Sequence, residues 1–207
     1  MTQVLIVSKT KMGKNGACIG GITIPDLKSV RLMNKDGSYH KVDTEFEVGQ
    51  LWEMGFKSAL VLTPPHYENV LIKSENLLSV GNEIKDLIDN KKLNAIVSKG
   101  DPSQLFEGLL GWTGNGHGYI SKAGGIPDHS TGFWITNKNL SYVSPYYVYT
   151  IKKGFFKINR GFKYVGFADP IPVIPAGTKI RISLAKWWRP DNIEIEERCY
   201  LQLSGWY

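Results

Sequence analysis

The sequence predicts a mainly β protein built from small barrels or sandwiches, on three observations. Most apolar segments are short and rich in branched or aromatic side chains, as strands are. Turn signals containing Gly, Pro, Asn or Asp separate these segments at short intervals. The chain has 207 residues, of which 42% are hydrophobic, enough for one large or two small cores.

The expected strands of the first half follow one another closely. Residues 3–10 are a branched apolar run, and residues 18–24 follow after a loop that contains glycine. Residues 28–33 alternate, and the Asp-Gly pair just after them suits the positive φ of a hairpin turn. Residues 49–57 alternate as well, and the Pro-Pro pair at 64–65 ends any ladder because proline has no N–H to donate.

Two short helices are expected between the halves. Asn82 is a suitable N-cap for residues 82–93, whose apolar side chains recur at helical spacing. Asp101 and Pro102 place a capping acid and a first-turn proline ahead of residues 103–110.

The glycine-rich residues 111–118 mark the best boundary between domains. We therefore expect a first domain over residues 1–111 and a second over residues 112–207. The expected strands of the second domain cover residues 118–123, 132–137, 146–151, 162–168, 178–185 and 198–207.

The excess of positive over negative charge lies in the second half of the chain. Residues 1–110 carry thirteen basic and thirteen acidic side chains, whereas residues 111–207 carry twelve and six. Between residues 111 and 190 there are eleven basic side chains and only two acids, Asp128 and Asp169. Such a field favours a polyanionic partner, although a merely solubilising surface has the same composition.

Residues 146–164 concentrate that charge beside aromatic rings, with seven rings, five Lys or Arg and no acid. If residues 160–165 are extended, Arg160, Phe162 and Tyr164 share one face. A basic groove with rings is typical of single-strand binding, where stacking contributes roughly 1–3 kcal/mol per base. A strand pair whose rings are core is the alternative, and it is favoured for any single ring.

The sequence thus predicts a nucleic-acid-binding surface in the second domain. The residues expected to contact phosphates are Lys152, Lys153, Lys157, Arg160 and Lys163. The residues expected to stack, where exposed, are Phe155, Phe156, Tyr164 and Trp188, with Arg189 beside the tryptophan. A candidate polar site of His66 and Glu68 lies on one side of an extended segment, where a rigid Pro-Pro corner is the alternative.

No pattern in the sequence supports catalysis, a metal or a cofactor. The loops at Gly13 and at residues 111–118 lack the offsets of a phosphate loop or a dinucleotide fingerprint. Zinc-ligand pairs are absent from the sequence. Asp128, His129 and Ser130 are neighbours that point to opposite faces of an extended chain, so they form no relay.

The same composition predicts a cytoplasmic protein without a membrane span. No run of about 18 or more apolar residues occurs, and the apolar run at residues 4–7 is too short for a secretory signal. Cys18 and Cys199 lie far apart in the sequence and are expected to be reduced thiols.

Several segments resemble the dual OB-containing domain family across nearly the whole chain. The matching elements are VLIVSKT with CIGGI, GQLWEM with PPHYENV, FKYVGFADP, and the closing SLA and RCYLQLSGWY. The family pattern favours Asp where this sequence has Asn69 and Thr where it has Ala168. Neither position is therefore expected to do chemistry.

The resemblance implies two small OB-like β-barrels in tandem, with one or two short helices between them, and no enzymatic activity. It also implies a place in bacterial anti-phage or conflict systems, sensing or holding DNA or RNA beside a separate effector such as an ATPase, helicase or nuclease. Two alternatives stay open: a protein-interaction adaptor subunit, and a nucleotide sensor with a site between the barrels near His66 and Glu68. An enzyme using His129 or His66 ranks last.

Overall fold

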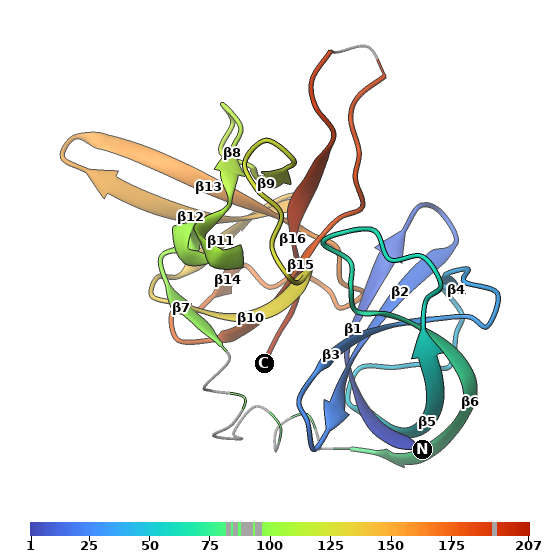
Figure 1. Ribbon diagram of the computed structural model, residues 1–207. Helices are drawn as coiled ribbons and strands as arrows, with labels where there is room; N and C mark the ends of the chain where they lie inside the picture. The colour runs from blue at the N-terminus through green and yellow to red at the C-terminus, as the bar shows by residue number, and fades with distance from the viewer. Residues whose placement is uncertain (82–83, 85–86, 88–92, 94–96, 192–193) are drawn as a thin grey trace. The chain divides into compact units, whose positions relative to one another are not determined.

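The computed structural model describes all residues except 82–83, 85–86, 88–92, 94–96 and 192–193 (Figure 1). The chain divides into two compact units, Met1–Ile96 with Tyr207, and Val97–Trp206. The boundary expected at residues 111/112 falls inside the second unit.

The first unit is a closed β-barrel. Its strands are β1 (Thr2–Met12), β2 (Gly16–Ile24), β3 (Ser29–Met33), β4 (His40–Lys41), β5 (Gln50–Ser58) and β6 (Asn69–Val80). The hydrogen-bonded order is β1-β5-β6-β3-β2, and pairing of β1 with β2 closes the ring. Only β3 and β6 run parallel in this ring. This is the connectivity of an OB fold, as the sequence predicted.

The core of this first barrel is a cluster of buried aliphatic side chains around Trp52. The indole nitrogen of Trp52 donates to the Gln50 side chain at 2.9 Å, and the ring meets that of Phe46 edge-on at 4.7 Å. Lys9, at the end of the opening apolar run, is also buried and pairs with Glu47. This lysine therefore stabilises the barrel instead of facing solvent.

The second unit repeats the OB connectivity with one strand in two pieces. Its strands are β7 (Ser98–Gly100), β8 (Gly111–Trp112), β9 (Gly118–Ser121), β10 (Thr131–Thr136), β11 (Leu140–Val143), β12 (Tyr146–Lys153), β13 (Phe156–Tyr164), β14 (Val173–Ile174), β15 (Lys179–Leu184) and β16 (Arg198–Trp206).

The central path of this sheet runs β11-β12-β13-β16-β15-β10. Strands β10 and β11, at its two ends, are separated by only three residues of chain. Taken together as one bent first strand, they close the path, with β13 and β16 as its parallel pair. In this assignment the hairpin β12–β13 supplies the second and third OB strands, whose outer face and neighbouring loops are where OB folds bind nucleic acid.

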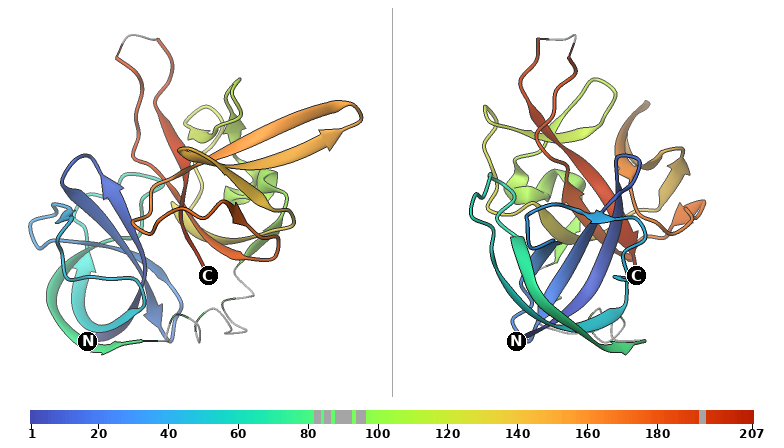
Figure 2. Two further views of the ribbon diagram at one scale, coloured as in Figure 1. Left: turned by 180° about the vertical axis from the view of Figure 1, so that it is seen from behind. Right: turned by 90° about the vertical axis from the view of Figure 1, so that its right-hand side faces the viewer.

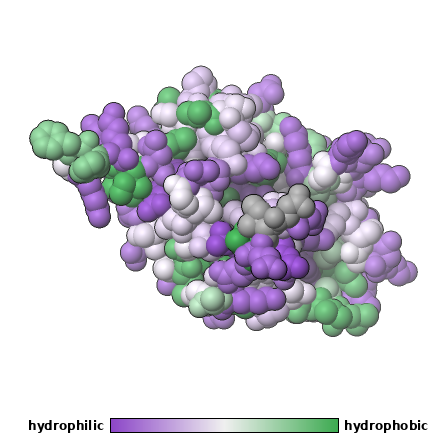
Figure 3. Space-filling model, turned by 90° about the horizontal axis from the view of Figure 1, so that it is seen from above, coloured by the Kyte–Doolittle hydropathy of each residue, from purple (hydrophilic) through white to green (hydrophobic). Residues whose placement is uncertain are grey.

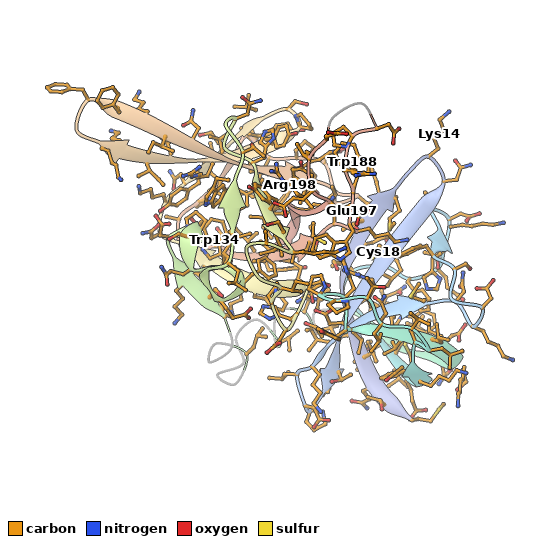
Figure 4. The ribbon with its side chains drawn as sticks, turned by 45° about the horizontal axis from the view of Figure 1, so that its top comes forward. Lys14, Cys18, Trp134, Trp188, Glu197 and Arg198 are labelled. Atoms are coloured by element: carbon orange, nitrogen blue, oxygen red, sulfur yellow. The ribbon has the colours of Figure 1, made fainter. Side chains whose placement is uncertain are left out.

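The core of the second barrel is aromatic. Trp134 is fully buried and stacks on Phe162 with 5.1 Å between ring centroids. The Trp134 indole nitrogen donates to the carbonyl of Gly100 at 3.0 Å, which holds β7 against β10. Figure 4 shows Trp134 within this unit.

Of the two helices expected between the halves, the structure describes the second in full. Residues 82–93 fall largely outside the described part of the chain. After Asp101 the structure has two 3-10 turns, η1 (Pro102–Gln104) and η2 (Phe106–Gly108), in place of a longer helix. Asp101 caps the first turn by accepting from the Ser103 N–H at 2.9 Å, as expected. Positive φ values at Phe106 and Glu107, 51° and 56°, prevent continuation as an α-helix.

Two segments extend from the second barrel, the β12–β13 hairpin and the connection between β15 and β16 (Figures 1 and 2).

Cys18 and Cys199 are both free thiols, as the sequence predicted. Within the described residues, no helix is long and apolar enough to cross a bilayer.

Candidate nucleic-acid interface

The β12–β13 hairpin carries most of the residues predicted to bind nucleic acid. Eight cross-strand pairs join the two strands, from Tyr146 with Lys163 at the barrel to Lys153 with Phe156 at the tip. Because side chains alternate along a strand, these pairs fall on two faces. The inner face holds Tyr147, Tyr149, Ile151 and Lys153 with their partners, and the outer face holds Tyr146, Val148, Thr150 and Lys152 with theirs.

The inner face is core where it lies against the barrel. Phe162 is fully buried, and its partner Tyr147 donates its hydroxyl to the carbonyl of Ile171 at 3.0 Å. Tyr164 is half-buried between Tyr147 and Trp206, with centroid distances of 5.7 and 5.3 Å. Neither Phe162 nor Tyr164 offers a free ring face to a base.

The Tyr164 hydroxyl is hydrogen-bonded to the backbone of a neighbouring loop. It donates to the carbonyl of Ala168 at 2.8 Å. Burial, with the nearby Tyr147, Asp169 and Tyr142 hydroxyl and carboxyl groups, raises the pKa of Tyr164 to about 12. The pKa rises because burial disfavours the charged form of the phenol. The ring contacts and the hydroxyl hydrogen bond indicate that Tyr164 stabilises this end of the barrel.

Arg160 lies where the inner face leaves the core. Its guanidinium covers the ring of Trp112 at 4.4 Å from the centroid, and Trp112 in turn meets Phe162 edge-on. The predicted interleaving of a cation with rings is thus present, but the ring on which Arg160 stacks belongs to β8. A guanidinium on an indole keeps edge N–H groups that can still reach a phosphate.

The outer face is covered beside the barrel by the loop that precedes β9. His117 forms an isolated bridge with Gly161, and the Gly161 N–H donates to the carbonyl of Gly116 at 2.9 Å. The His117 ring lies over Gly161 and stacks on Tyr146, with 4.4 Å between centroids and 11° between planes. This near part of the usual OB surface is therefore occupied by the chain itself.

The far part of the hairpin is open. Phe155 and Phe156 at its tip are 105% and 78% exposed. Lys152, Lys153 and Lys157 beside them, and Lys163 nearer the barrel, are exposed. In the described part of the chain none of these four lysines makes an ion pair. Figure 3 shows apolar atoms at the end of this arm with hydrophilic atoms behind them.

Most other cations of the second unit are engaged within it. Lys179 and Arg181 are buried, and Arg181 lies over the Phe133 ring at 4.8 Å. Lys138 donates to the carbonyl of Thr150 at 3.1 Å, and Lys122 pairs with Glu197 at 3.5 Å. The positive charge counted in the sequence is thus divided between structural contacts and the free lysines of the hairpin.

The connection between β15 and β16 carries the other predicted residues. Trp188 is 55% exposed, and its backbone exchanges two hydrogen bonds with Arg198 at 3.0 and 2.9 Å. Figure 4 shows Trp188, Glu197 and Arg198 gathered at this connection. Arg189 is exposed next to Trp188.

A cation–ring group beside Trp188 was missed by the sequence reasoning. Arg198 lies over the ring of Tyr119 at 4.0 Å, and Tyr200 lies between Tyr119 and Trp188 at 6.2 and 6.0 Å. Their strands β9 and β16 are far apart in sequence, so the only local hint was an arginine two residues before a tyrosine, Arg198 and Tyr200.

The candidate polar site in the first unit is less open. His66 is 4% exposed, and its backbone N–H donates to the backbone carbonyl of Thr63 at 2.9 Å. Glu68 is half-buried, and its backbone carbonyl accepts a hydrogen bond from the backbone N–H of Arg31 at 2.7 Å. A nucleotide site between the barrels stays a prediction.

Residues 128–130 place His129 and Ser130 in different surroundings. His129 is half exposed and contacts the Glu107 carboxylate at 3.1 Å, whereas Ser130 is fully buried. Among the described residues, no group of three or more His, Cys, Asp or Glu side chains is placed to hold a metal ion.

Comparison with known proteins adds a family. The family model described as "Dual OB-containing domain" matches residues 2–206. A solved structure described as a murine DNA-binding protein bound to double-stranded DNA aligns over 99% of this chain and 96% of that one, at 10% identity and a TM-score of 0.29. So low a TM-score carries no argument about this chain. No curated protein matches it.

Proposed function

Because this chain belongs to the dual OB-containing domain family, we propose that it is a non-catalytic module that binds single-stranded or structured DNA or RNA. The second barrel is the binding element. The observation that carries the proposal is the β12–β13 hairpin, where three exposed lysines without acidic partners flank two exposed phenylalanine rings and a fourth, Lys163, lies nearer the barrel.

Each part of the hairpin has a role in this proposal. Lys152, Lys153, Lys157 and Lys163 neutralise phosphates, which releases counterions and makes binding dependent on salt. Phe155 and Phe156 stack on bases, a contact that tolerates any sequence because every base has a π face. Arg160 adds a phosphate contact from the Trp112 side, and Trp188 and Arg189 extend the surface along the β15–β16 connection.

A second candidate function rests on the same rings. Exposed apolar rings at a protruding tip also suit insertion into a pocket of an acidic protein, which would make the chain an adaptor. Recovery of a stoichiometric partner that survives nuclease treatment would favour the adaptor. A place beside an ATPase, helicase or nuclease effector in a bacterial anti-phage system is part of the first proposal, and pull-down from the native host tests it.

Fluorescence anisotropy with labelled DNA and RNA oligonucleotides tests binding directly. We expect binding at low salt whose logarithm falls linearly with the logarithm of salt concentration, by about 0.7 per neutralised phosphate on single strands. Replacement of the four hairpin lysines by Gln is expected to remove most of this dependence. The control replaces four exposed lysines of the first unit, Lys28, Lys35, Lys57 and Lys73.

Undetectable binding at low salt, or affinity that does not change with salt, would contradict the proposal. Equal losses in the two lysine variants would show that net charge matters and the hairpin does not.

A further inference from the structure

The tip of the β12–β13 hairpin holds two apolar rings that the protein itself does not cover. Resting on the proposed function, we propose that this hairpin is an arm that reaches into duplex nucleic acid and inserts Phe155 and Phe156 between bases where stacking is already interrupted. Bulges, nicks and mismatches are such places.

The exposure of the rings is the first support. Phe155 is 105% and Phe156 78% exposed, whereas Phe162, six residues further along the same face as Phe156, is fully buried. Burial of a Phe ring away from water is favourable, and two neighbouring exposed rings leave that free energy unrealised in the folded protein. A ligand that buries both rings would gain that free energy on binding.

The turn presents the rings outward. Gly154 has φ of 57° and forms with Phe155 the two-residue turn between the paired Lys153 and Phe156. A glycine at the first turn position supplies the positive φ that such tight hairpins need. A Cβ added at Gly154 would meet nothing within 4 Å, so the tip is free of the rest of the chain.

The dimensions suit a groove. From Thr150 and its partner Asn159 to the turn, each strand has four residues, which at about 3.3 Å each reach roughly 13 Å. The major groove of a duplex is about 12 Å wide and admits a two-stranded ribbon, and apolar wedges on other proteins enter from the minor groove. The arm is long enough to lie along a groove while its tip meets the base stack.

The lysines near the tip are placed to contact the phosphates of a bound duplex. Lys152 and Lys157 lie opposite one another on the outer face, and Lys153 lies opposite Phe156 on the inner face. Both faces of the arm therefore carry a cation within a residue or two of the rings. Phosphates on the two sides of a groove flank an inserted tip in the same way.

A duplex fits this surface better than a single strand lying across the barrel. The outer face is covered at Gly161 and Tyr146 by His117, so a strand running along the usual OB surface would meet that ring. Opening an intact base step costs free energy, and the cost is lower where stacking is already broken. Two rings on a narrow arm therefore select interrupted steps.

The experiment compares two DNA duplexes that differ only in a one-base bulge, with 2-aminopurine next to the bulge or at the matching position. Anisotropy gives affinity, and 2-aminopurine fluorescence rises when its neighbour is unstacked. For the wild-type chain we expect about tenfold tighter binding to the bulged duplex and a fluorescence rise on binding.

Matched variants isolate the rings. F155A/F156A is expected to lose the fluorescence rise and to bind the bulged and the intact duplex with equal affinity, because the lysines that remain contact phosphates in both. F155Y/F156Y, which keeps flat rings, is expected to keep the preference. The control L60A/V61A alters an exposed apolar pair of the first unit and should change nothing.

The possible failures are distinguishable. If the alanine variant keeps the bulge preference and the fluorescence rise, the insertion proposal is wrong while nucleic-acid binding stands. If it loses all affinity for both duplexes, the rings contribute general binding and not selective insertion. If the wild-type chain binds neither duplexes nor single strands, the proposed function fails first.

Discussion

Lys152 and Lys157 lie directly opposite one another in the register of the β12–β13 hairpin. Like charges in directly opposed positions destabilise a strand pair. No acidic residue lies between positions 129 and 168 to offset them within the segment. The folded hairpin thus retains a repulsion that a bound polyanion would relieve, which relates its stability to its proposed ligand.

Lys157→Glu tests this relationship, because it replaces the repulsion by an opposite-charge pair with Lys152. We expect stability to stay equal or to rise by about 0.2–1 kcal/mol, while affinity for nucleic acid falls. Thermal unfolding and anisotropy measure the two effects. Lys73→Glu, an exposed position in the first unit, is the charge-matched control. A loss of stability in Lys157→Glu would show that Lys157 has a structural role.

Phe162 and Phe156 test the division of the inner face into core and surface. Phe162→Ala removes a fully buried ring that stacks on Trp134 and is expected to cost about 3–5 kcal/mol of unfolding free energy. Phe156→Ala, on the same face near the tip, is expected to change it by less than about 0.5 kcal/mol. Urea unfolding compares them. Similar losses would mean that the tip packs against the protein.

Gly116→Ala tests the loop that covers the outer face. Gly116 has φ of 79°, and a Cβ there would lie 2.0 Å from the carbonyl oxygen of Asn159. We expect a loss of stability of about 1–3 kcal/mol, because both the conformation and the contact are unfavourable to alanine. The control is Gly114→Ala, whose added Cβ meets nothing within 4 Å. Urea unfolding of both variants is the measurement, and equal stabilities would contradict the assigned contact.

Tyr164 makes stability depend on alkaline pH. Its pKa is raised by burial from the ordinary 10.0 to about 12, so the unfolded chain releases this proton first. The stabilisation is therefore complete below pH 10 and is lost as pH rises toward 12. We expect Tyr164→Phe to show a weaker fall in unfolding free energy between about pH 10 and 12 than the wild-type chain. Parallel pH profiles of the two would contradict this.

Local pattern was sufficient for some strands of the second half and for the family resemblance. Alternation of side chains and Gly-containing turns are properties of neighbouring residues, so segment 146–151 lies within β12 and most of segment 178–185 lies within β15. The strand expected over residues 162–168 was mostly wrong, because β13 begins at Phe156 and ends at Tyr164. The bent first strand, β10 with β11, was not foreseen, because only its pairing partners β15 and β12 show that its two pieces act as one strand.

The sequence by itself determined the composition of the site: rings and uncompensated lysines in residues 146–164, and an excess of positive charge in the second half of the chain. Only the tertiary structure decided which of these side chains are free. Phe162 is core because Trp134 lies against it, Arg160 stacks on Trp112, and Gly161 is covered by His117. Each of these partners is distant in the sequence, and burial depends on such non-local packing. Side chains of one type within one segment can therefore be buried at one position and exposed at another.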